Sequence, residues 1–362
     1  MLYKVIGLMS GSSLDGLDIV FAELQEIAGK WDYEIVAANC IEYDEAWQHK
    51  LRLTTEMNAR DYQLLHAEYG RFIGLKINKF IEANNLQHKV NLISSHGHTT
   101  FHLPKQNMTH QLGDGAAIAA VTGLPVVSDL RAMDIAFGGE GAPIVPLGEK
   151  LLFPGYNYFL NIGGIANLSI KNEDGIVAFD VCAANRILNM LAGEKSLSYD
   201  DEGKLSATGK IHDELLEKLN LLKYYTLDYP KSLANSFGTD TVFPIIKSFK
   251  IRMEDALATY TEHICIQIKN SLKPFAKEEK QNVFITGGGA FNTFLISRLK
   301  QNFEEVNFEI YIPPADVVKY KEALIMALLG TLRWREQYTV LASVTGAARN
   351  SIGGALWLGT EA

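Results

Sequence analysis

Apolar and polar positions alternate over short stretches near the start of the chain, which is the pattern of half-buried strands. Residues 5–9, 19–24 and 35–41 are rich in Val, Ile, Leu and Ala. A stretch rich in Gly and Ser joins the first two, and the third follows a polar turn at Gly29 and Lys30. The pattern therefore predicts three consecutive antiparallel strands.

A helical pattern follows these strands, because apolar side chains then recur every three or four residues. The predicted apolar face consists of Leu65, Tyr69, Phe72, Ile73, Ile77 and Phe80. Asp61 is the predicted N-cap of this helix. The next predicted elements are a strand at 90–94, a helix at 113–122 and a strand at 125–130.

The same plan is repeated from about residue 155. Residues 158–161 and 166–170 predict a hairpin and residues 176–180 a third strand. A later predicted helix has the apolar face Leu257, Tyr260, Ile264 and Ile268, and a strand at 283–285 leads into three glycines. The repetition predicts an α/β fold of two duplicated lobes, 1–150 and 151–362, with mixed central sheets around one cleft.

Composition narrows the class of partner. The chain has 362 residues, 47% of them hydrophobic and 21% charged, with a formal net charge of −8. This negative net charge gives no electrostatic attraction to nucleic acid or to an anionic membrane. We therefore expect small-molecule partners. No signal-like or membrane-spanning apolar stretch is present in the sequence, and three widely spaced cysteines argue against disulfides, so we expect a cytoplasmic protein.

Glycine-rich loops follow several of the predicted strands. In residues 7–18, GLMSGSSLDGLD, backbone N–H groups and hydroxyls gather where a strand ends, as an anion such as phosphate requires. The stretch lacks the Gly-Lys-Ser or Gly-Lys-Thr of a P-loop, and an ordinary tight turn is the alternative. Residues 161–167 and 286–292 hold comparable loops in the second lobe, and together the three favour nucleotide binding in one cleft.

These loops and their order resemble the actin, Hsp70 and sugar-kinase superfamily, and the detailed motifs resemble the anhydro-N-acetylmuramic acid kinase family. The matching segments are residues 7–18, 95–99, 113–114, 128–146, 161–168, 287–292 and 321–323. The resemblance implies an ATP-dependent transferase of amino sugar metabolism in peptidoglycan recycling. In that reaction water opens the 1,6-anhydro bond of 1,6-anhydro-N-acetylmuramic acid while O6 takes the γ-phosphoryl group. The resemblance also allows a homodimer.

The expected cofactors are ATP and Mg²⁺. The predicted nucleotide-binding residues are Gly11, Ser12, Ser13, Leu14, Asp15, Gly16, Leu17, Asp18, Asn161, Gly163, Gly164, Asn167, Gly287, Gly288, Gly289 and Asn292. We expect Mg²⁺ to be held mostly by ATP oxygens and waters. Actin-like chains carry an aspartate where this chain has Met9, which leaves Asp15 or Asp18 as the candidate protein ligand. A structural role is the equal alternative for Asp18, which lies within the apolar alternation of the second predicted strand.

Two acids are the predicted catalytic residues. Asp180 ends the predicted third strand of the second lobe, and the resemblance makes it the general base that activates water. A helix N-cap is its structural alternative. The resemblance makes Glu322 a second acid that orients water or substrate, with an exposed surface glutamate as the alternative.

The segment from residue 128 predicts sugar recognition. The predicted substrate-binding residues are His96, Gly97, Asp129, Arg131, Asp134, Gly138 and Gly139. Arg131 is the candidate for the lactyl carboxylate of muramic acid, and a structural Arg–Asp pair is the alternative. His96 and His98 lack a nearby Cys or Glu at ligand spacing, so we do not expect zinc.

The stretch after Asp180 departs from the family pattern. Where the family often has Asp-Thr-Gly-Pro-Gly-Asn, this chain has Asp-Val-Cys-Ala-Ala-Asn. If either lost glycine requires a positive φ, Cys182 or Ala184 is strained by about 1 kcal/mol or more. The departure keeps open a kinase for another amino sugar. An ATP-hydrolysing binding or chaperone module is a further alternative, but no large extra domain is evident.

Overall fold

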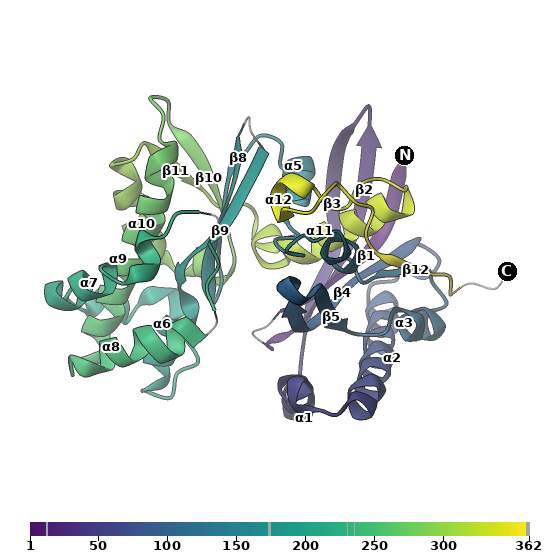
Figure 1. Cartoon of the computed structure of the whole chain (residues 1–362), viewed down its shortest axis with the longest axis horizontal. Coiled ribbons are helices and arrows are strands. Elements are labelled where there is room, and N and C mark those ends of the chain that lie inside the picture. The colour runs from purple at the N-terminus through teal and green to yellow at the C-terminus, as the bar shows by residue number, and fades with distance from the viewer. Residues whose placement is uncertain (12–13, 173–174, 230, 235, 360–362) are drawn as a thin grey trace. The chain divides into compact units, whose positions relative to one another are not determined.

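The computed structural model describes residues 1–11, 14–172, 175–229, 231–234 and 236–359 (Figure 1). The chain forms two compact units, Met1–Pro154 with Tyr320–Ala362, and Gly155–Lys319. The first boundary lies close to the predicted residue 150. The C-terminal segment differs from the prediction, since it packs with the first unit and not with the second.

The first unit is built on one mixed sheet. Its strands are β1 (Leu2–Ser10), β2 (Gly16–Ile27), β3 (Lys30–Glu42), β4 (Leu92–Leu103), β5 (Met108–Leu112), β6 (Val126–Ser128) and β12 (Ala355–Trp357). The strand order is β12-β6-β4-β1-β2-β3, and β5 pairs with β4. The first three strands are antiparallel, as predicted, and β4 and β6 extend the sheet in parallel on the other side of β1.

Helices pack on both faces of this sheet. They are α1 (Glu45–Arg52), α2 (Ala59–Ala83), α3 (Gly115–Thr122), α4 (Ala132–Ala136), α5 (Pro146–Leu152), α11 (Ala315–Trp334) and α12 (Ala342–Thr345). The buried side of α2 joins Ile6 and Leu8 of β1 in one core. The N-cap of α2 is Asn58 and not the predicted Asp61, because Asn58 Oδ1 accepts a hydrogen bond from the Asp61 N–H at 3.0 Å.

Gly7 explains why the C-terminal segment returns to the first unit. It lies between Ile6 and Leu8 and therefore faces the opposite side of the sheet. A Cβ there would collide with the carbonyl oxygen of Ala323 and would lie 2.7 Å from the backbone nitrogen of Ala327. Only glycine allows α11 to approach β1 this closely, so the α11 backbone rests directly on the strand.

The second unit repeats the strand order of the first. Its strands are β7 (Tyr158–Ile162), β8 (Ile165–Asn172), β9 (Gly175–Ala183), β10 (Gln281–Thr286) and β11 (Phe308–Tyr311). They follow the order β11-β10-β7-β8-β9, in which β7, β8 and β9 are antiparallel and β10 and β11 are parallel to β7. The predicted duplication of a mixed sheet is therefore confirmed.

The helices of the second unit gather around α9, as Figure 1 shows. They are α6 (Asn185–Gly193), α7 (Asp213–Asn220), α8 (Phe243–Ser248), α9 (Met253–Leu272) and α10 (Thr293–Glu304). The predicted apolar face of α9 is fully buried, and the Tyr260 hydroxyl donates to the Ala183 carbonyl at 2.8 Å. Within the described part of the chain, no helix has the length and apolarity that a membrane crossing requires.

Candidate active-site residues

A row of four polar residues crosses the sheet of the second unit. Thr286 of β10 pairs with Asn161 of β7, Asn161 pairs with Asn167 of β8, and Asn167 pairs with Asp180 of β9. Residues paired directly across strands point to the same face of a sheet. The sheet thus brings two predicted nucleotide-binding residues beside the predicted base. Thr286, which donates to Asn161 Oδ1 at 3.3 Å, was not predicted.

Within the described residues, the Asp180 carboxylate is held through one of its two oxygens. Its Oδ2 accepts hydrogen bonds from the Leu233 N–H at 2.8 Å and the Ser232 hydroxyl at 3.4 Å. The Oδ1 atom has no hydrogen-bond partner among the described residues. Burial raises the pKa of Asp180 above its usual value, and the two donors partly oppose that rise. The arrangement fixes the carboxyl group while leaving one oxygen to accept a proton.

Asp180 does not cap the following helix. Strand β9 continues beyond it to Ala183, and Ala184 occupies the N-cap position of α6 without a side-chain hydrogen bond. Neither Cys182 nor Ala184 has a positive φ, so the loss of two glycines causes no left-handed strain. Cys182 is fully buried in the core of the unit, as expected of a packed side chain and not of a nucleophile.

The hairpin at Gly163 and Gly164 joins β7 to β8 beside the start of α6. The Gly163 carbonyl accepts from the Asn185 N–H at 3.0 Å, and the Gly164 carbonyl accepts from the Ala184 N–H at 2.8 Å. The Asn185 amide also donates to the Ile162 carbonyl at 3.0 Å. These bonds fix the hairpin against the helix, so its glycines form an ordered turn close to the polar row.

The loop after β10 packs closely on the end of β7. Gly287 has a φ of 83°, and a Cβ there would lie 2.7 Å from Asn161 Oδ1. Gly289 faces the Ile162 side chain, whereas at Gly288 the nearest atom to a Cβ would be Asn185 Nδ2 at 3.5 Å. Asn292 caps α10, since its Oδ1 accepts from the Leu295 N–H at 2.9 Å. The Asn292 side chain is thus used within the protein.

The N-terminal loop is shorter than the predicted binding stretch. Ser12 and Ser13 lie outside the described residues. Gly11, Leu14 and Asp15 belong to the turn, while Gly16, Leu17 and Asp18 are part of β2. The Leu17 side chain is buried in the core of the unit, so it is not available to a ligand.

Two acids of the first unit interact with one another. Burial raises the pKa of Asp18 to about 6, and the charges of Glu322 and Asp15 raise it further, against a hydrogen bond with Cys40 that lowers it. Burial also raises the pKa of Glu322, opposed by Lys321 and Arg131. Lys321 itself forms a buried ion pair with Glu149 at 2.6 Å. Glu322 is therefore no ordinary surface glutamate.

Arg131 is held in a fixed orientation by His96. The Arg131 Nε–H donates to His96 Nε2 at 2.8 Å, and Nη1 donates to the Gly141 carbonyl at 2.5 Å. His96 must then donate from Nδ1 to the Gly97 carbonyl at 2.9 Å, so both its ring nitrogens are used. Burial and the charge of Arg131 lower the pKa of His96 to about 3, which keeps the ring neutral. His96 therefore orients Arg131 and has no nitrogen left for a sugar.

Asp134 also differs from its predicted role. It is 1% exposed, its Oδ2 accepts from the Gly141 N–H at 2.7 Å, and its Oδ1 accepts from the Thr345 hydroxyl at 2.6 Å. Gly139 packs directly on this carboxyl group, where a Cβ would collide with it. Asp134 thus holds the 138–141 loop in place. Gly138, with a φ of 76°, faces open space.

Asp129 remains available to a ligand. It has a φ of 56° directly after β6 and is partly exposed, and its Oδ2 accepts from the Ser128 hydroxyl at 2.6 Å. Gly97, with a φ of 73°, packs on the Leu112 carbonyl. The first unit thus places Asp129, Arg131 and Glu322 as candidate polar contacts, while His96 and Asp134 support them.

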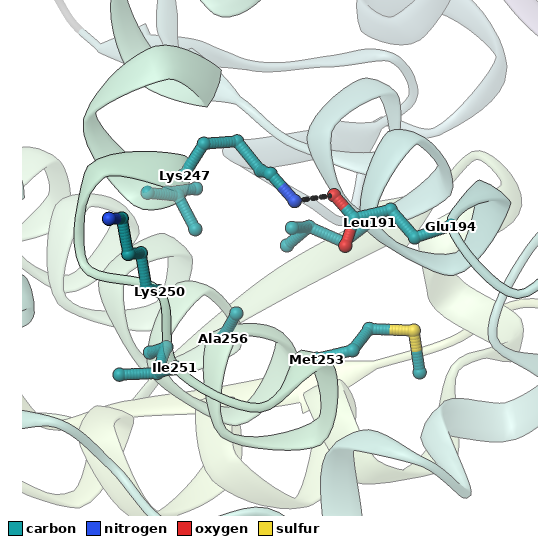
Figure 2. A pocket seen from close by; sticks show the side chains of 8 residues that line it. Leu191, Glu194, Lys247, Lys250, Ile251, Met253 and Ala256 are labelled. Carbon is teal, nitrogen blue, oxygen red and sulfur yellow. Dashed lines mark hydrogen bonds and ion pairs between the residues drawn. The ribbon is translucent and has the colours of Figure 1, made fainter.

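No protein-built metal site is evident in the described ranges, which contain no group of three or more His, Cys, Asp or Glu side chains able to hold an ion. A depression in the second unit holds none of the predicted residues. Its lining comprises Leu191, Glu194, Ile246, Lys247, Lys250, Ile251, Met253 and Ala256, and the Lys247–Glu194 ion pair of 2.6 Å crosses it (Figure 2). That the predicted loops of the two units share one cleft stays a prediction.

Comparison with known proteins identifies relatives over almost the whole length. The family model described as anhydro-N-acetylmuramic acid kinase matches residues 3–359. A protein of that name from Aliivibrio fischeri is 34% identical over 312 residues, which cover 82% of this chain and 83% of the relative. Another from Haemophilus influenzae is 29% identical, covering 94% of each. Among solved structures, a dehydratase activator from Clostridium difficile with bound ADPNP is 16% identical with a TM-score of 0.44, covering 93% of this chain and 96% of that one.

Proposed function

Because the chain belongs to the anhydro-N-acetylmuramic acid kinase family, we propose that it converts 1,6-anhydro-N-acetylmuramic acid, water and ATP to N-acetylmuramic acid 6-phosphate and ADP in peptidoglycan recycling. The observation that best supports the chemistry is the Asp180 carboxylate, which is fixed through Oδ2 while Oδ1 has no hydrogen-bond partner among the described residues. A homodimer and a cytoplasmic location stay predictions.

In the proposed reaction, Asp180 takes a proton from the water that attacks the anomeric carbon. A positioned general base contributes about 10²- to 10⁴-fold to the rate. The bond from the anomeric carbon to O6 breaks as the new bond to water oxygen forms, and O6 attacks the γ-phosphorus of ATP. Glu322, partly buried on α11, is the proposed second acid and orients water or sugar.

The nucleotide is proposed to bind along the loops at 11–15, 163–164 and 287–289, with Asn161 and Asn167 as polar contacts beside Asp180. Asp18 is the proposed protein ligand of Mg²⁺. The negative charges of Glu322 and Asp15 act on its carboxylate, and a bound cation would reduce the repulsion among the three acids. Since Mg²⁺ usually keeps phosphate and water ligands and takes one or two carboxylates, no protein cage is required. When bound, the ion neutralises charge on the phosphate oxygens.

Arg131 is the proposed ligand of the lactyl carboxylate. Burial lowers the pKa of Arg131 to about 10, so it remains a cation at neutral pH. Its Nε and one Nη1 hydrogen are used by His96 and Gly141, while Nη2 has no hydrogen-bond partner among the described residues. A guanidinium fixed on one edge and free on the other is suited to a carboxylate. Asp129 is the proposed acceptor for a sugar hydroxyl or amide.

A substrate panel tests the proposal. The protein is incubated with ATP and Mg²⁺ and with either the anhydro sugar, N-acetylmuramic acid, N-acetylglucosamine or no sugar, and both ADP and sugar phosphate are measured. The proposal expects equal amounts of ADP and sugar phosphate with the anhydro sugar. Preference for a free amino sugar would favour a different sugar kinase, and ADP without sugar phosphate would favour an ATP-hydrolysing binding module.

A further inference from the structure

A chain of buried hydroxyl groups leads from the core of the first unit to His98. Tyr69, fully buried on α2, contacts the Tyr43 hydroxyl at 2.5 Å. The Tyr43 hydroxyl donates to Ser10 Oγ at 2.8 Å, and Ser10 Oγ lies 3.1 Å from His98 Nδ1. Ser10 is the last residue of β1, directly before the loop proposed to bind phosphate.

Counting protons restricts the direction of these hydrogen bonds. Each hydroxyl has one hydrogen to donate. Because Tyr43 uses its hydrogen toward Ser10, Tyr69 must donate to Tyr43. Ser10 then has its own hydrogen left. At 2% exposure, its acceptors among the described residues are His98 Nδ1 at 3.1 Å and the Tyr69 hydroxyl, whose hydrogen bond with Ser10 lowers the pKa of Tyr69. If His98 donated from Nδ1 instead, the Ser10 hydrogen would turn to the Tyr69 hydroxyl, and a ring of three hydroxyls would replace the chain that ends at His98.

The other nitrogen of His98 is not used by the described part of the chain. His98 is 6% exposed, and burial lowers its pKa to about 4, so its ring is neutral at physiological pH. With Nδ1 accepting from Ser10, the ring proton must be on Nε2. The Nε2 atom has no hydrogen-bond partner among the described residues, and the residue keeps 6% of its surface exposed. A nearly buried ring thus presents one open N–H donor at the end of β1.

We propose that His98 donates a hydrogen bond from Nε2 to a ligand oxygen at the end of β1, and that Tyr69, Tyr43 and Ser10 hold the ring in the tautomer that makes this possible. Phosphate oxygens of the nucleotide and hydroxyl oxygens of the sugar share the required chemistry. Only the identity of the ligand rests on the proposed function, because the tautomer is a property of the protein alone. His98 contacts the ligand, whereas Tyr43 is a positioning residue that acts through it.

The first test measures the tautomer without any activity assay. Long-range ¹⁵N–¹H correlation spectra of the full chain labelled at histidine, assigned with His98→Gln, show which ring nitrogen has the proton. The proposal expects Nε2–H in the wild type and a loss of this preference in Tyr43→Phe. The matched control is Tyr62→Phe, which removes another tyrosine hydroxyl that bonds to Thr100 and His110 and leaves the His98 chain intact. A proton on Nδ1, or an unchanged tautomer in Tyr43→Phe, would overturn the proposal.

The second test identifies the ligand. MgADP and the anhydro sugar are added separately to the wild-type protein, and the one whose oxygen accepts the bond shifts the His98 Nε2–H resonance. Absence of a shift with both ligands would refute ligand binding by His98, even if the protein phosphorylates the sugar. Conversely, a shift with MgADP would support it even if the sugar assignment fails.

The variant kinetics separate binding from folding. His98→Phe should lower kcat/KM about 10- to 100-fold, as expected for loss of one hydrogen bond to a charged or transferring group. His98→Gln, whose amide accepts from Ser10 and donates to the ligand, should keep activity within a few-fold of the wild type. Tyr43→Phe should lower activity in the wild type and have little further effect in His98→Phe. An equal loss in His98→Gln and His98→Phe, or independent effects of Tyr43 and His98, would contradict the proposal.

Discussion

Replacement of Asp180 by Asn tests the proposed base while preserving the fold. Asn has nearly the same shape as Asp, and its amide oxygen can still accept from the Leu233 N–H that now holds Oδ2 at 2.8 Å. The change removes the ability to take a proton. Loss of a general base worth about 10²- to 10⁴-fold corresponds to roughly 3–5 kcal/mol of transition-state stabilisation. We therefore expect kcat to fall by this factor with little change in the Kd of MgATP.

The stability of the same variant should move in the opposite direction. Because burial raises the folded-state pKa of Asp180 above its unfolded value, the ionised group disfavours folding. The contribution of Asp180 to stability is therefore greatest below its pKa in the unfolded state, where the carboxyl group is protonated. This contribution is lost as the pH rises through the pKa of Asp180 in the folded state. At pH 7, Asp180→Asn should thus keep or raise Tm. The wild-type kcat should fall as the pH drops through the raised pKa, and this limb should be absent in the variant.

Steady-state kinetics, calorimetric MgATP binding and thermal unfolding measure these effects together. Asp228→Asn is the matched control, because it neutralises an exposed carboxylate of the same unit. It should behave as the wild type in all three measurements. Near-normal kcat in Asp180→Asn would refute the base role, and a large fall in Tm would show that the carboxylate is structural.

Further predictions concern the first unit. Arg131→Ala should raise the KM for the sugar at least 10-fold with little effect on that for ATP, and His96→Phe should raise the same KM less; an equal change in both KM values would contradict a sugar-specific role. Asp134→Ala should lower the free energy of unfolding by about 1–3 kcal/mol in urea titrations, because it leaves the buried Gly141 N–H without a partner; an unchanged stability would refute this. Asp18→Asn should raise the free energy of unfolding of the ligand-free protein at pH 7 by roughly 1–3 kcal/mol, since ionisation above a pKa of about 6 opposes folding. The same variant should weaken Mg²⁺-dependent ATP binding. Unchanged binding in calorimetry would exclude Asp18 as a ligand. Gly7→Ala should destabilise by about 1–3 kcal/mol through its collision with α11, whereas Gly193→Ala, which meets no atom within 4 Å, should not.

Local sequence patterns predict the elements of this fold well. The alternating strands and the glycine-rich turns between them indicate the antiparallel start of each sheet, and these features depend on neighbours close in sequence. The position of the C-terminal segment is different. Residues 323–329 of α11 are all fully buried, so no apolar stripe indicates which unit the helix contacts. The contact between Gly7 and Ala323 decides this, and sequence spacing alone does not show it.

The same distinction applies to the functional residues. Asn161, Asn167 and Asp180 are visible in the sequence because each belongs to a predicted strand with a polar residue near its end. Leu233 acts on Asp180 through a backbone N–H, which no residue type predicts. Asp134 and Asn292 also form internal hydrogen bonds that the sequence does not predict, since carboxylate and amide side chains satisfy internal N–H groups as readily as they bind ligands.

The mass of the product provides the most direct test of the proposed reaction. The protein is given ATP, Mg²⁺ and equal concentrations of 1,6-anhydro-N-acetylmuramic acid and N-acetylmuramic acid, distinguished by isotope labels, and the products are separated and weighed by mass spectrometry. We predict that the label of the anhydro sugar appears in a product heavier by one phosphoryl group and one water molecule, and that Asp180→Asn forms this product about 10²- to 10⁴-fold more slowly. Phosphorylation of the anhydro sugar without addition of water, or of the free sugar alone, would contradict the account.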